Sequence, residues 1–249
     1  MNTTVIKSRF ITVRFYKRLS SFKAISFDLD DTLYDNHPVI TKAEAELQSH
    51  LQQIAPECAN LGREFWWQHR NVCLTNQPEL CHDVTALRLA CMQAGIEALG
   101  YSELEAKQKA QNAFDYFLSH RNNLQVPDRV KALLQGLSEK YPLVAISNGN
   151  VSIEEIGISD YFSHSFFAGD GNLQKPEADM FEQASQALSI ERKDLLHIGD
   201  CTHADIYGAL SAGCQTIWIN NDEFGIRKKP LKVLPNAEFD HVEQLAMFY

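Results

Sequence analysis

Two aspartates at the end of a short apolar run are the residues of this sequence best suited to chemistry. Asp28 and Asp30 follow the run 24–27, which is typical of a buried strand. One carboxylate can attack phosphorus and form an aspartyl-phosphate, and the other can donate a proton to the leaving oxygen and later accept one from water. Alone, the two acids also suit a simple turn. The complete segment 27–33, Phe-Asp-Leu-Asp-Asp-Thr-Leu, is far more specific and favours the chemical interpretation.

Groups that can bind phosphate occur further along the chain. Ser147, Asn148 and Gly149 follow a second apolar run, and a hydroxyl with neighbouring main-chain N–H groups can hold phosphate oxygens. Lys175, just before Pro176, offers a compact positive charge that suits phosphate oxygens and a nucleophilic carboxylate. Each feature alone has a simpler explanation, which is an ordinary turn for the first and a solvated lysine for the second.

A third acidic group suggests a metal. Asp200 follows Gly199, and Asp205 lies five residues further on. With Asp28 and Asp30 they would bring four carboxylates into one pocket, where like charges raise one another's pKa. A hard divalent cation relieves this repulsion, and Mg²⁺ prefers a few carboxylates together with waters and phosphate oxygens. The sequence therefore predicts Mg²⁺ as the cofactor, with Asp205 either near the metal or simply an acid at a helix N-terminus.

The elements that must position these residues alternate between strands and helices. Such alternation predicts an α/β fold with a parallel sheet. Because ligands bind beyond the carboxyl ends of the strands in such sheets, the candidate residues are expected to converge there. The predicted strands are 24–27, 143–146, 165–168, 195–198 and 216–219, and the predicted helices are 128–140, 176–188 and 204–212.

The stretch between the first two predicted strands shows only helical periodicity. It predicts an inserted helical domain at 37–124, with a core domain made of 1–36 and 125–249. A bundle placed directly after the nucleophile can exclude water and position the leaving group. Packing inside the bundle explains the tryptophans better than substrate binding does, and a helix start explains His82-Asp83 equally well. The candidates for the substrate face are Trp66, Trp67, His69, Arg70, His82, Asp83 and Arg88.

Composition limits the class of protein. The 249 residues are 45% hydrophobic and carry a net charge of −9, which is ordinary globular composition and argues against a general nucleic-acid binder. No apolar run is long enough to predict a membrane span. The six cysteines lack metal-site spacing, so we expect reduced thiols and a cytoplasmic protein. The first 22 residues are basic and predict a short tail before the first strand.

The ordered motifs resemble those of the haloacid dehalogenase-like (HAD) hydrolase superfamily. The matching residues extend over about 23–219, and the helical insert looks like that family's type I cap beside a Rossmann-like core. The resemblance implies a phosphatase of small phosphate monoesters, with a phosphorylated metabolite as its partner. The residues that carry it are Asp28-x-Asp30-x-Thr32, Ser147, Lys175 and Gly199-Asp200 with Asp205.

The resemblance also implies a role for each position. Asp28 would be the nucleophile and a metal ligand. Asp30 would be the general acid and base, and would bind Mg²⁺ through its main-chain carbonyl. Asp200 would be the third metal ligand, with Asp205 close by. The substrate-binding positions would be Thr32, which supports the loop, Ser147 and Asn148, which hold phosphate, and Lys175, which bridges phosphate and Asp28.

One position departs from the family's commonest fourth motif. Cys201 follows Asp200, and His203 comes shortly before Asp205. The main-chain roles survive this change, and the sequence leaves open whether Cys201 makes the enzyme sensitive to oxidation.

A narrower resemblance points to a substrate class. The segments 27–36, 82–85 and 142–150 are similar to bacterial HAD phosphatases of flavin biosynthesis, which act on 5-amino-6-(5-phospho-D-ribitylamino)uracil and accept FMN. In that light, residues 1–12 are interpreted as an upstream extension of the reading frame. The alternatives are a haloacid dehalogenase, a phosphomutase, or an inactive binding protein on the same scaffold. Asp30 and Asp200 favour the phosphatase over the dehalogenase. The sequence fixes neither the physiological substrate nor the oligomeric state.

Overall fold

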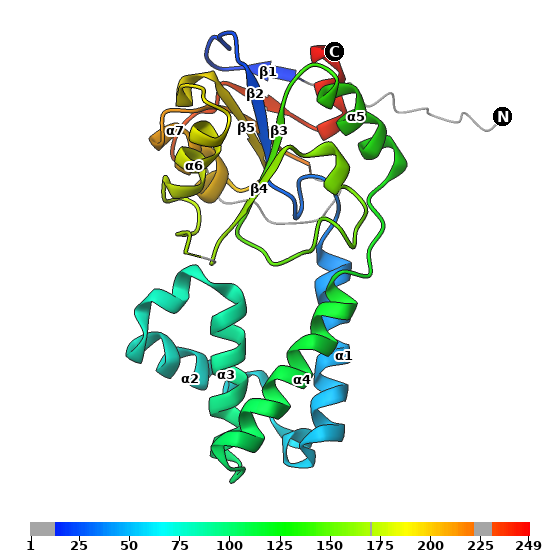
Figure 1. Ribbon diagram of the computed structural model, residues 1–249, viewed down its shortest axis with the longest axis vertical. Coiled ribbons are helices and arrows are strands. Elements are labelled where there is room, and N and C mark those ends of the chain that lie inside the picture. Colours follow the sequence, from blue (N-terminus) through cyan, green and yellow to red (C-terminus); the bar gives the residue numbers. More distant parts are fainter. Residues whose placement is uncertain (1–12, 170, 222–230) are drawn as a thin grey trace, which may run out of the picture.

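A central sheet with helices on both faces holds the candidate residues (Figure 1). The computed structural model describes residues 13–169, 171–221 and 231–249. Its seven strands lie in the order β1-β7-β6-β5-β2-β3-β4, and only β1 runs antiparallel to its neighbour. The strands are β1 (Val13–Phe15), β2 (Ala24–Phe27), β3 (Leu143–Ser147), β4 (His164–Phe167), β5 (Leu195–Gly199), β6 (Gln215–Ile219) and β7 (Ala237–Phe239).

The predicted α/β fold is confirmed, and all five predicted strands are present. The prediction that the first 22 residues are only a tail is wrong, because Val13–Phe15 pairs with β7. Arg14 also forms an ion pair of 2.6 Å with Glu238 across this pairing. The interpretation of residues 1–12 as an upstream extension falls outside the described residues.

Among the described residues, three α-helices cover the sheet (Figure 1). They are α5 (Asp128–Ser138), α6 (Asp179–Ala187) and α7 (Gly208–Ser211). A π-helical turn, Thr202–Tyr207, leads into α7, and a 3-10 helix, Val242–Phe248, ends the chain. The helix predicted from residue 176 begins three residues later, because hydrogen bonds to Asn148 hold the main chain of Lys175 outside the helix.

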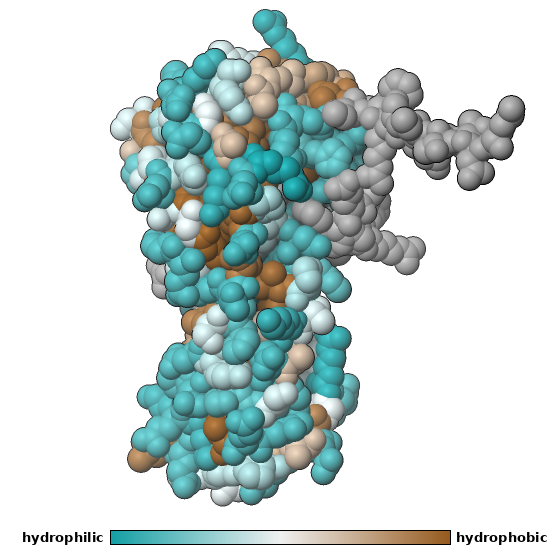
Figure 2. All heavy atoms as spheres, turned by 90° about the vertical axis from the view of Figure 1, so that its right-hand side faces the viewer, coloured by the Kyte–Doolittle hydropathy of each residue, from teal (hydrophilic) through white to brown (hydrophobic). Residues whose placement is uncertain are grey.

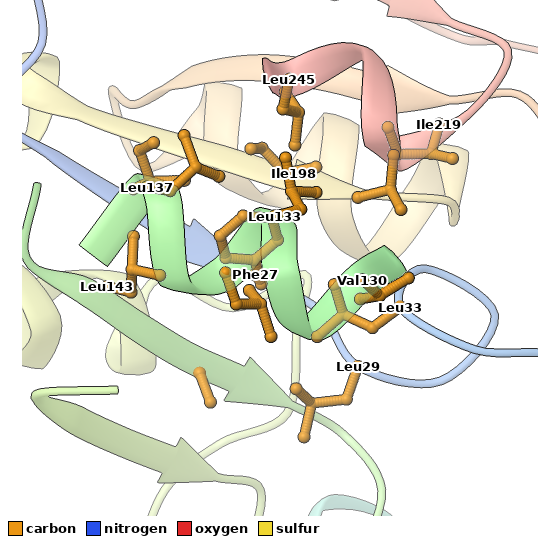
Figure 3. Packing of buried hydrophobic residues seen from close by; sticks show 14 of the residues in the cluster. Phe27, Leu29, Leu33, Val130, Leu133, Leu137, Leu143, Ile198, Ile219 and Leu245 are labelled. Atoms are coloured by element: carbon orange, nitrogen blue, oxygen red, sulfur yellow. The ribbon is translucent and has the colours of Figure 1, made fainter. Parts of the chain in front are cut away.

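Hydrophobic residues at helical spacing fix α5 on the sheet. Val130, Leu133 and Leu137 are buried against Phe27 and Ile198 in one continuous core (Figure 3). On the opposite face, Met180 and Phe181 of α6 are buried with Val144 and Ile146 of β3. The central strands are therefore buried on both faces, as expected of a parallel sheet.

The helical segment between β2 and α5 forms a separate unit beside the sheet (Figure 1). This helical unit has its own core, which includes Leu47, Met92, Ile96 and Phe114 and shares no residue with the core of the sheet. Figure 2 shows that the molecule narrows where the two parts join, and that this face of the helical unit is mostly hydrophilic. Its helices are α1 (His37–Ile54), α2 (Arg63–Asn76), α3 (Val84–Ala98) and α4 (Glu103–Arg121).

Within the described ranges, no helix combines the length and the apolar character that a membrane crossing needs.

Candidate active site

Asp28 lies at the carboxyl end of β2, one of the two central strands of the parallel part of the sheet. Its main-chain N–H donates to the carbonyl of Ile198 on β5 at 2.9 Å, and its side chain is largely buried. The chain then turns sharply at Asp31, whose φ of 61° lies in the left-handed region, which aspartate enters more readily than most residues. This turn brings Tyr34 back beside Asp30.

A buried lysine joins two of the acidic motifs. The Lys175 Nζ donates to Asp28 Oδ1 at 2.7 Å, to Asp205 Oδ1 at 2.7 Å and to the Ile146 carbonyl at 2.6 Å. All three ammonium protons are therefore used. The side chain of Lys175 is 1% exposed, so the simpler explanation of a solvated surface lysine is wrong.

Burial and charge set the protonation of this cluster. Burial raises the pKa of Asp28 to about 7, although the Lys175 ammonium opposes the shift. Burial also raises the pKa of Asp205, but the Lys175 charge and the His197 hydrogen bond outweigh it and hold that pKa below its usual range. For Lys175, burial lowers the pKa and the two carboxylates raise it above its ordinary value. Lys175 and Asp205 are thus a fixed ion pair beside an acid that titrates near neutrality.

Asp205 is held by a buried chain that the sequence did not predict. His197 Nε2 lies 3.2 Å from Asp205 Oδ1, and its Nδ1 lies 2.9 Å from the Ser26 hydroxyl. Burial lowers the pKa of His197, so the ring is neutral, donates from Nε2 and accepts at Nδ1. The Cys201 N–H donates to the other Asp205 oxygen at 2.8 Å. Asp205 therefore positions Lys175 and is no ordinary acid at a helix N-terminus.

The donors for a cation lie beside this ion pair. Carboxylate oxygens of Asp28, Asp200 and Asp205 lie within 4.8 Å of one another. The Thr32 hydroxyl lies 3.3 Å from Asp28 Oδ2 and 3.4 Å from Asp200 Oδ1. Hard oxygen donors at this density fit Mg²⁺. The Asp205 side chain is 1% exposed, against 12% for Asp28, and it is already bonded by Lys175, His197 and the Cys201 N–H. Asp28 and Asp200 would therefore be better placed to hold a cation.

The segment after β3 places two more candidates at the same edge of the sheet. Ser147 is buried, and its Oγ accepts the Gly149 N–H at 3.0 Å. The Asn148 side chain accepts from the Lys175 N–H at 2.8 Å and donates to the Lys175 carbonyl at 2.9 Å. This pair of bonds fixes the segment that carries Lys175. Because the Asn148 side chain is used in these bonds, Asn148 would contact phosphate through its main chain.

Asp30 points to a different set of partners from Asp28. Arg121 Nη2, at the end of α4, donates to both Asp30 oxygens at 2.6 and 2.7 Å. The Tyr34 hydroxyl donates to Asp30 Oδ1 at 2.7 Å. Burial and the Asp30 charge raise the pKa of Tyr34 well above its ordinary value, so it remains a neutral donor. Arg121 was not among the residues predicted from the sequence. In the structure it is almost fully buried.

Gly149 leaves the space that the Asp30 carboxylate occupies. A Cβ atom at Gly149 would lie 2.8 Å from Asp30 Oδ2 and 3.4 Å from Ser147 Oγ. We expect Gly149→Ala to displace the Asp30 carboxylate and lower kcat by about tenfold or more, since small misplacements of reacting groups are costly. Steady-state kinetics on an aryl phosphate measures this. Gly62→Ala is the control, because nothing lies within 4 Å of a Cβ there; an equal loss in both variants would contradict the explanation.

The residues predicted for the substrate face of the helical unit differ in burial and in their contacts. Trp66 packs in the core of the helical unit, whereas Trp67 is 53% exposed. Arg88 lies over the Phe117 ring and pairs with Glu44 within the unit. His69 contacts the Phe65 carbonyl of its own helix, and Arg70 is exposed.

The start of α3 lies against the sheet domain. Asp83 Oδ1 accepts the Ala86 N–H at 2.8 Å, which confirms a helix start. His82 Nδ1 lies 3.3 Å from the Gln174 N–H, and Thr85 Oγ1 accepts from Asn150 at 3.2 Å. The segment that carries His82 and Asp83 therefore contacts the segments that carry Ser147 and Lys175.

All six cysteines are free thiols. The Cys201 sulfur accepts the Ala204 N–H at 3.4 Å at the start of the π-helical turn. Burial raises its pKa, which lowers the fraction of reactive thiolate.

Comparison with known proteins agrees with this arrangement. The family model of haloacid dehalogenase-like hydrolases matches residues 22–213. The chain belongs to this family. It is 34% identical to 5-amino-6-(5-phospho-D-ribitylamino)uracil phosphatase YigB of Escherichia coli strain K12, over 94% of this chain and 98% of that protein. The predicted enzyme class, a HAD-type phosphatase, is confirmed by the family and by this relative.

Two other similar proteins bear dehalogenase names. The crystal structure of 2-haloacid dehalogenase from Pseudomonas syringae pv. Tomato DC3000 superposes with a TM-score of 0.84 at 33% identity, covering 91% of this chain and 97% of that one. The (S)-2-haloacid dehalogenase of Pseudomonas sp. strain YL is 27% identical over 80% of this chain and 82% of its own length. These matches support the Rossmann-like core with a helical cap. Because both proteins bear dehalogenase names, dehalogenation is the alternative activity to test.

Proposed function

We propose that this protein is an Mg²⁺-dependent phosphatase that hydrolyses small phosphate monoesters through an aspartyl-phosphate on Asp28. The observation that carries the proposal is the cluster of Asp28, Lys175 and Asp200, with Asp30 beside it on the same turn. A dehalogenase with an aspartate nucleophile needs neither the second acid nor a metal. Asp30 and Asp200 are therefore the residues that favour phosphate chemistry.

Each residue then has a defined task. Asp28 attacks phosphorus, and Lys175 holds Asp28 in place and neutralises charge at the phosphate. Asp30 donates a proton to the leaving oxygen and then accepts one from the water that hydrolyses the aspartyl-phosphate. The Ser147 Oγ accepts the Gly149 N–H, so its own hydroxyl proton remains available. This proton is donated to a phosphate oxygen of the substrate.

The cation would be held by Asp28 and Asp200, with the Asp30 main-chain carbonyl as the third protein ligand. When bound, Mg²⁺ supplies positive charge that stabilises the phosphoryl oxygens and favours the ionised form of Asp28. This fits a nucleophile whose pKa burial raises to about 7.

We infer that residues 37–124 form the cap over a core of 1–36 and 125–249, since the helical unit has its own hydrophobic core. The segment that carries His82, Asp83 and Thr85 then borders the entrance to the site. A small phosphorylated metabolite is the proposed partner, and the E. coli relative makes 5-amino-6-(5-phospho-D-ribitylamino)uracil the first substrate to test, with FMN beside it. The cytoplasmic location stays a prediction.

Metal removal tests the proposal directly. We expect the purified protein to hydrolyse p-nitrophenyl phosphate with Mg²⁺, to lose this activity in excess EDTA and to regain it with added Mg²⁺. Mg²⁺ should also raise the melting temperature of the wild-type protein, because it binds the folded state, and this rise should vanish in Asp200→Asn.

Phosphate release that persists in EDTA would contradict the proposal. Chloride release from 2-chloropropionate without phosphatase activity would favour the dehalogenase. Transfer of the phosphoryl group back to a sugar instead of to water would favour the phosphomutase. Product analysis separates a phosphomutase from a phosphatase, because only the phosphatase releases inorganic phosphate.

A further inference from the structure

A buried arginine, Arg121, contacts Asp30, which is the proposed general acid and base. Its side chain is 3% exposed, while that of Asp30 is 23% exposed. The Arg121 Nη2 group reaches both Asp30 oxygens, and Tyr34 bonds the carboxylate as well. With Gly149 packed against the other side, the Asp30 carboxylate has one defined direction.

Arg121 belongs to the helical unit, whereas Asp30 belongs to the turn after β2. It is the last residue of α4, at the point where the chain returns to the sheet domain (Figure 1). Asn122 follows it and accepts the Ser152 N–H at 3.1 Å. A change in the angle between α4 and the sheet would therefore move the guanidinium relative to Asp30.

Stability alone explains this contact poorly. The Arg121 Nη1 group is buried and has no hydrogen-bond partner among the described residues, and an unpaired buried donor is costly. Asp30 is partly exposed, so water could solvate its carboxylate without an arginine. Buried ion pairs are in general weak evidence for stabilisation.

We propose that Arg121 is a positioning residue that sets the direction of the Asp30 carboxyl group and ties it to the orientation of the helical unit. This inference rests on the proposed role of Asp30 as general acid. A proton donor helps only when it points at the leaving oxygen, and it matters most when the leaving group is a poor one. Arg121 is thus expected to contribute most to the hydrolysis of alkyl phosphates and least to that of p-nitrophenyl phosphate.

The experiment compares Arg121→Gln with the wild-type holoenzyme on a series of aryl phosphates and one alkyl phosphate, with Mg²⁺ present. We expect kcat/KM on the alkyl phosphate, which reports the step that releases the leaving group, to fall by more than about tenfold, and kcat/KM on p-nitrophenyl phosphate to fall by a smaller factor. The steeper dependence on the leaving group should match that of Asp30→Asn. In the Asp30→Asn background, Arg121→Gln should add little further loss, since both act on one step.

Controls separate this role from a structural one. Arg129→Gln makes the same change at a surface arginine that pairs with Glu243 and should leave the dependence on the leaving group unchanged. Arg121→Lys keeps a cationic donor and should show the same trend with smaller losses, which preserves the test if Arg121→Gln does not fold. An equal loss of kcat/KM on every substrate in an active, EDTA-sensitive enzyme would overturn this inference alone. A wild-type protein without EDTA-sensitive phosphatase activity would instead overturn the proposed function.

Discussion

Asp28→Asn is expected to lower kcat for p-nitrophenyl phosphate by at least about 10⁴-fold, since loss of a nucleophile has an effect of this order or larger. The substitution removes the attacking oxygen but keeps nearly the same volume. The neighbouring Lys175 retains Asp205 and the Ile146 carbonyl as partners. We therefore expect the variant to fold, with a circular dichroism spectrum like that of the wild type.

A covalent trap identifies the step that is lost. After acid quenching with a substrate labelled in its phosphoryl group, label should remain on the wild-type protein and be absent from Asp28→Asn. Asp31→Asn is a matched control for the change of charge. Asparagine tolerates the φ of 61° at this position, and its amide oxygen can still accept the Asn36 N–H. Activity near the wild-type level in Asp28→Asn would remove the mechanism proposed here.

The second large effect concerns stability. Lys175→Met should abolish turnover and also lower the free energy of unfolding by about 3–5 kcal/mol, because it leaves the buried carboxylates of Asp28 and Asp205 without their cation. Urea denaturation followed by fluorescence measures the loss. Lys193→Met is the control, since Lys193 pairs with Glu191 on the surface and should contribute little.

A double variant tests the cause. Lys175→Met with Asp205→Asn should recover part of the lost stability, because one uncompensated charge is removed with the lysine, but it should recover no activity. A Lys175→Met protein as stable as the wild type would show that the buried ion pair is not what holds this segment. In that case the two Asn148 bonds to the main chain of Lys175 would be sufficient.

The sequence predicts the parts of the fold that rest on local patterns. The five apolar strand segments and the helical spacing of α5 depend on residues close in the chain, and both are present in the structure. β1 and β7 were missed because each has three residues and a charged one in the middle, Arg14 or Glu238, which pair only through the fold.

The same distinction applies to the site. Asp28, Ser147 and Asp200 could be proposed because each follows an apolar run that ends at the same edge of the sheet. Arg121 could not, since it lies 91 residues from Asp30 in the sequence and looks like any basic residue at the end of a helix. His197 had no signal either, because a histidine inside a strand is more often an ordinary core residue. Asn148 was predicted to hold phosphate, and only the structure reveals that its side chain bonds the main chain of Lys175.

The two hydrophobic cores have no residue in common, and this separation bears on how such an enzyme evolves. Substitutions at distant sites without shared partners act nearly independently, so mutations that reshape the helical unit leave the packing beneath Asp28 and Lys175 intact. Preference for one metabolite over another can then drift while the hydrolytic step is preserved. Arg121 is the exception, because it belongs to the helical unit but contacts Asp30, the proposed general acid. We therefore expect lineages that change substrate to keep this arginine.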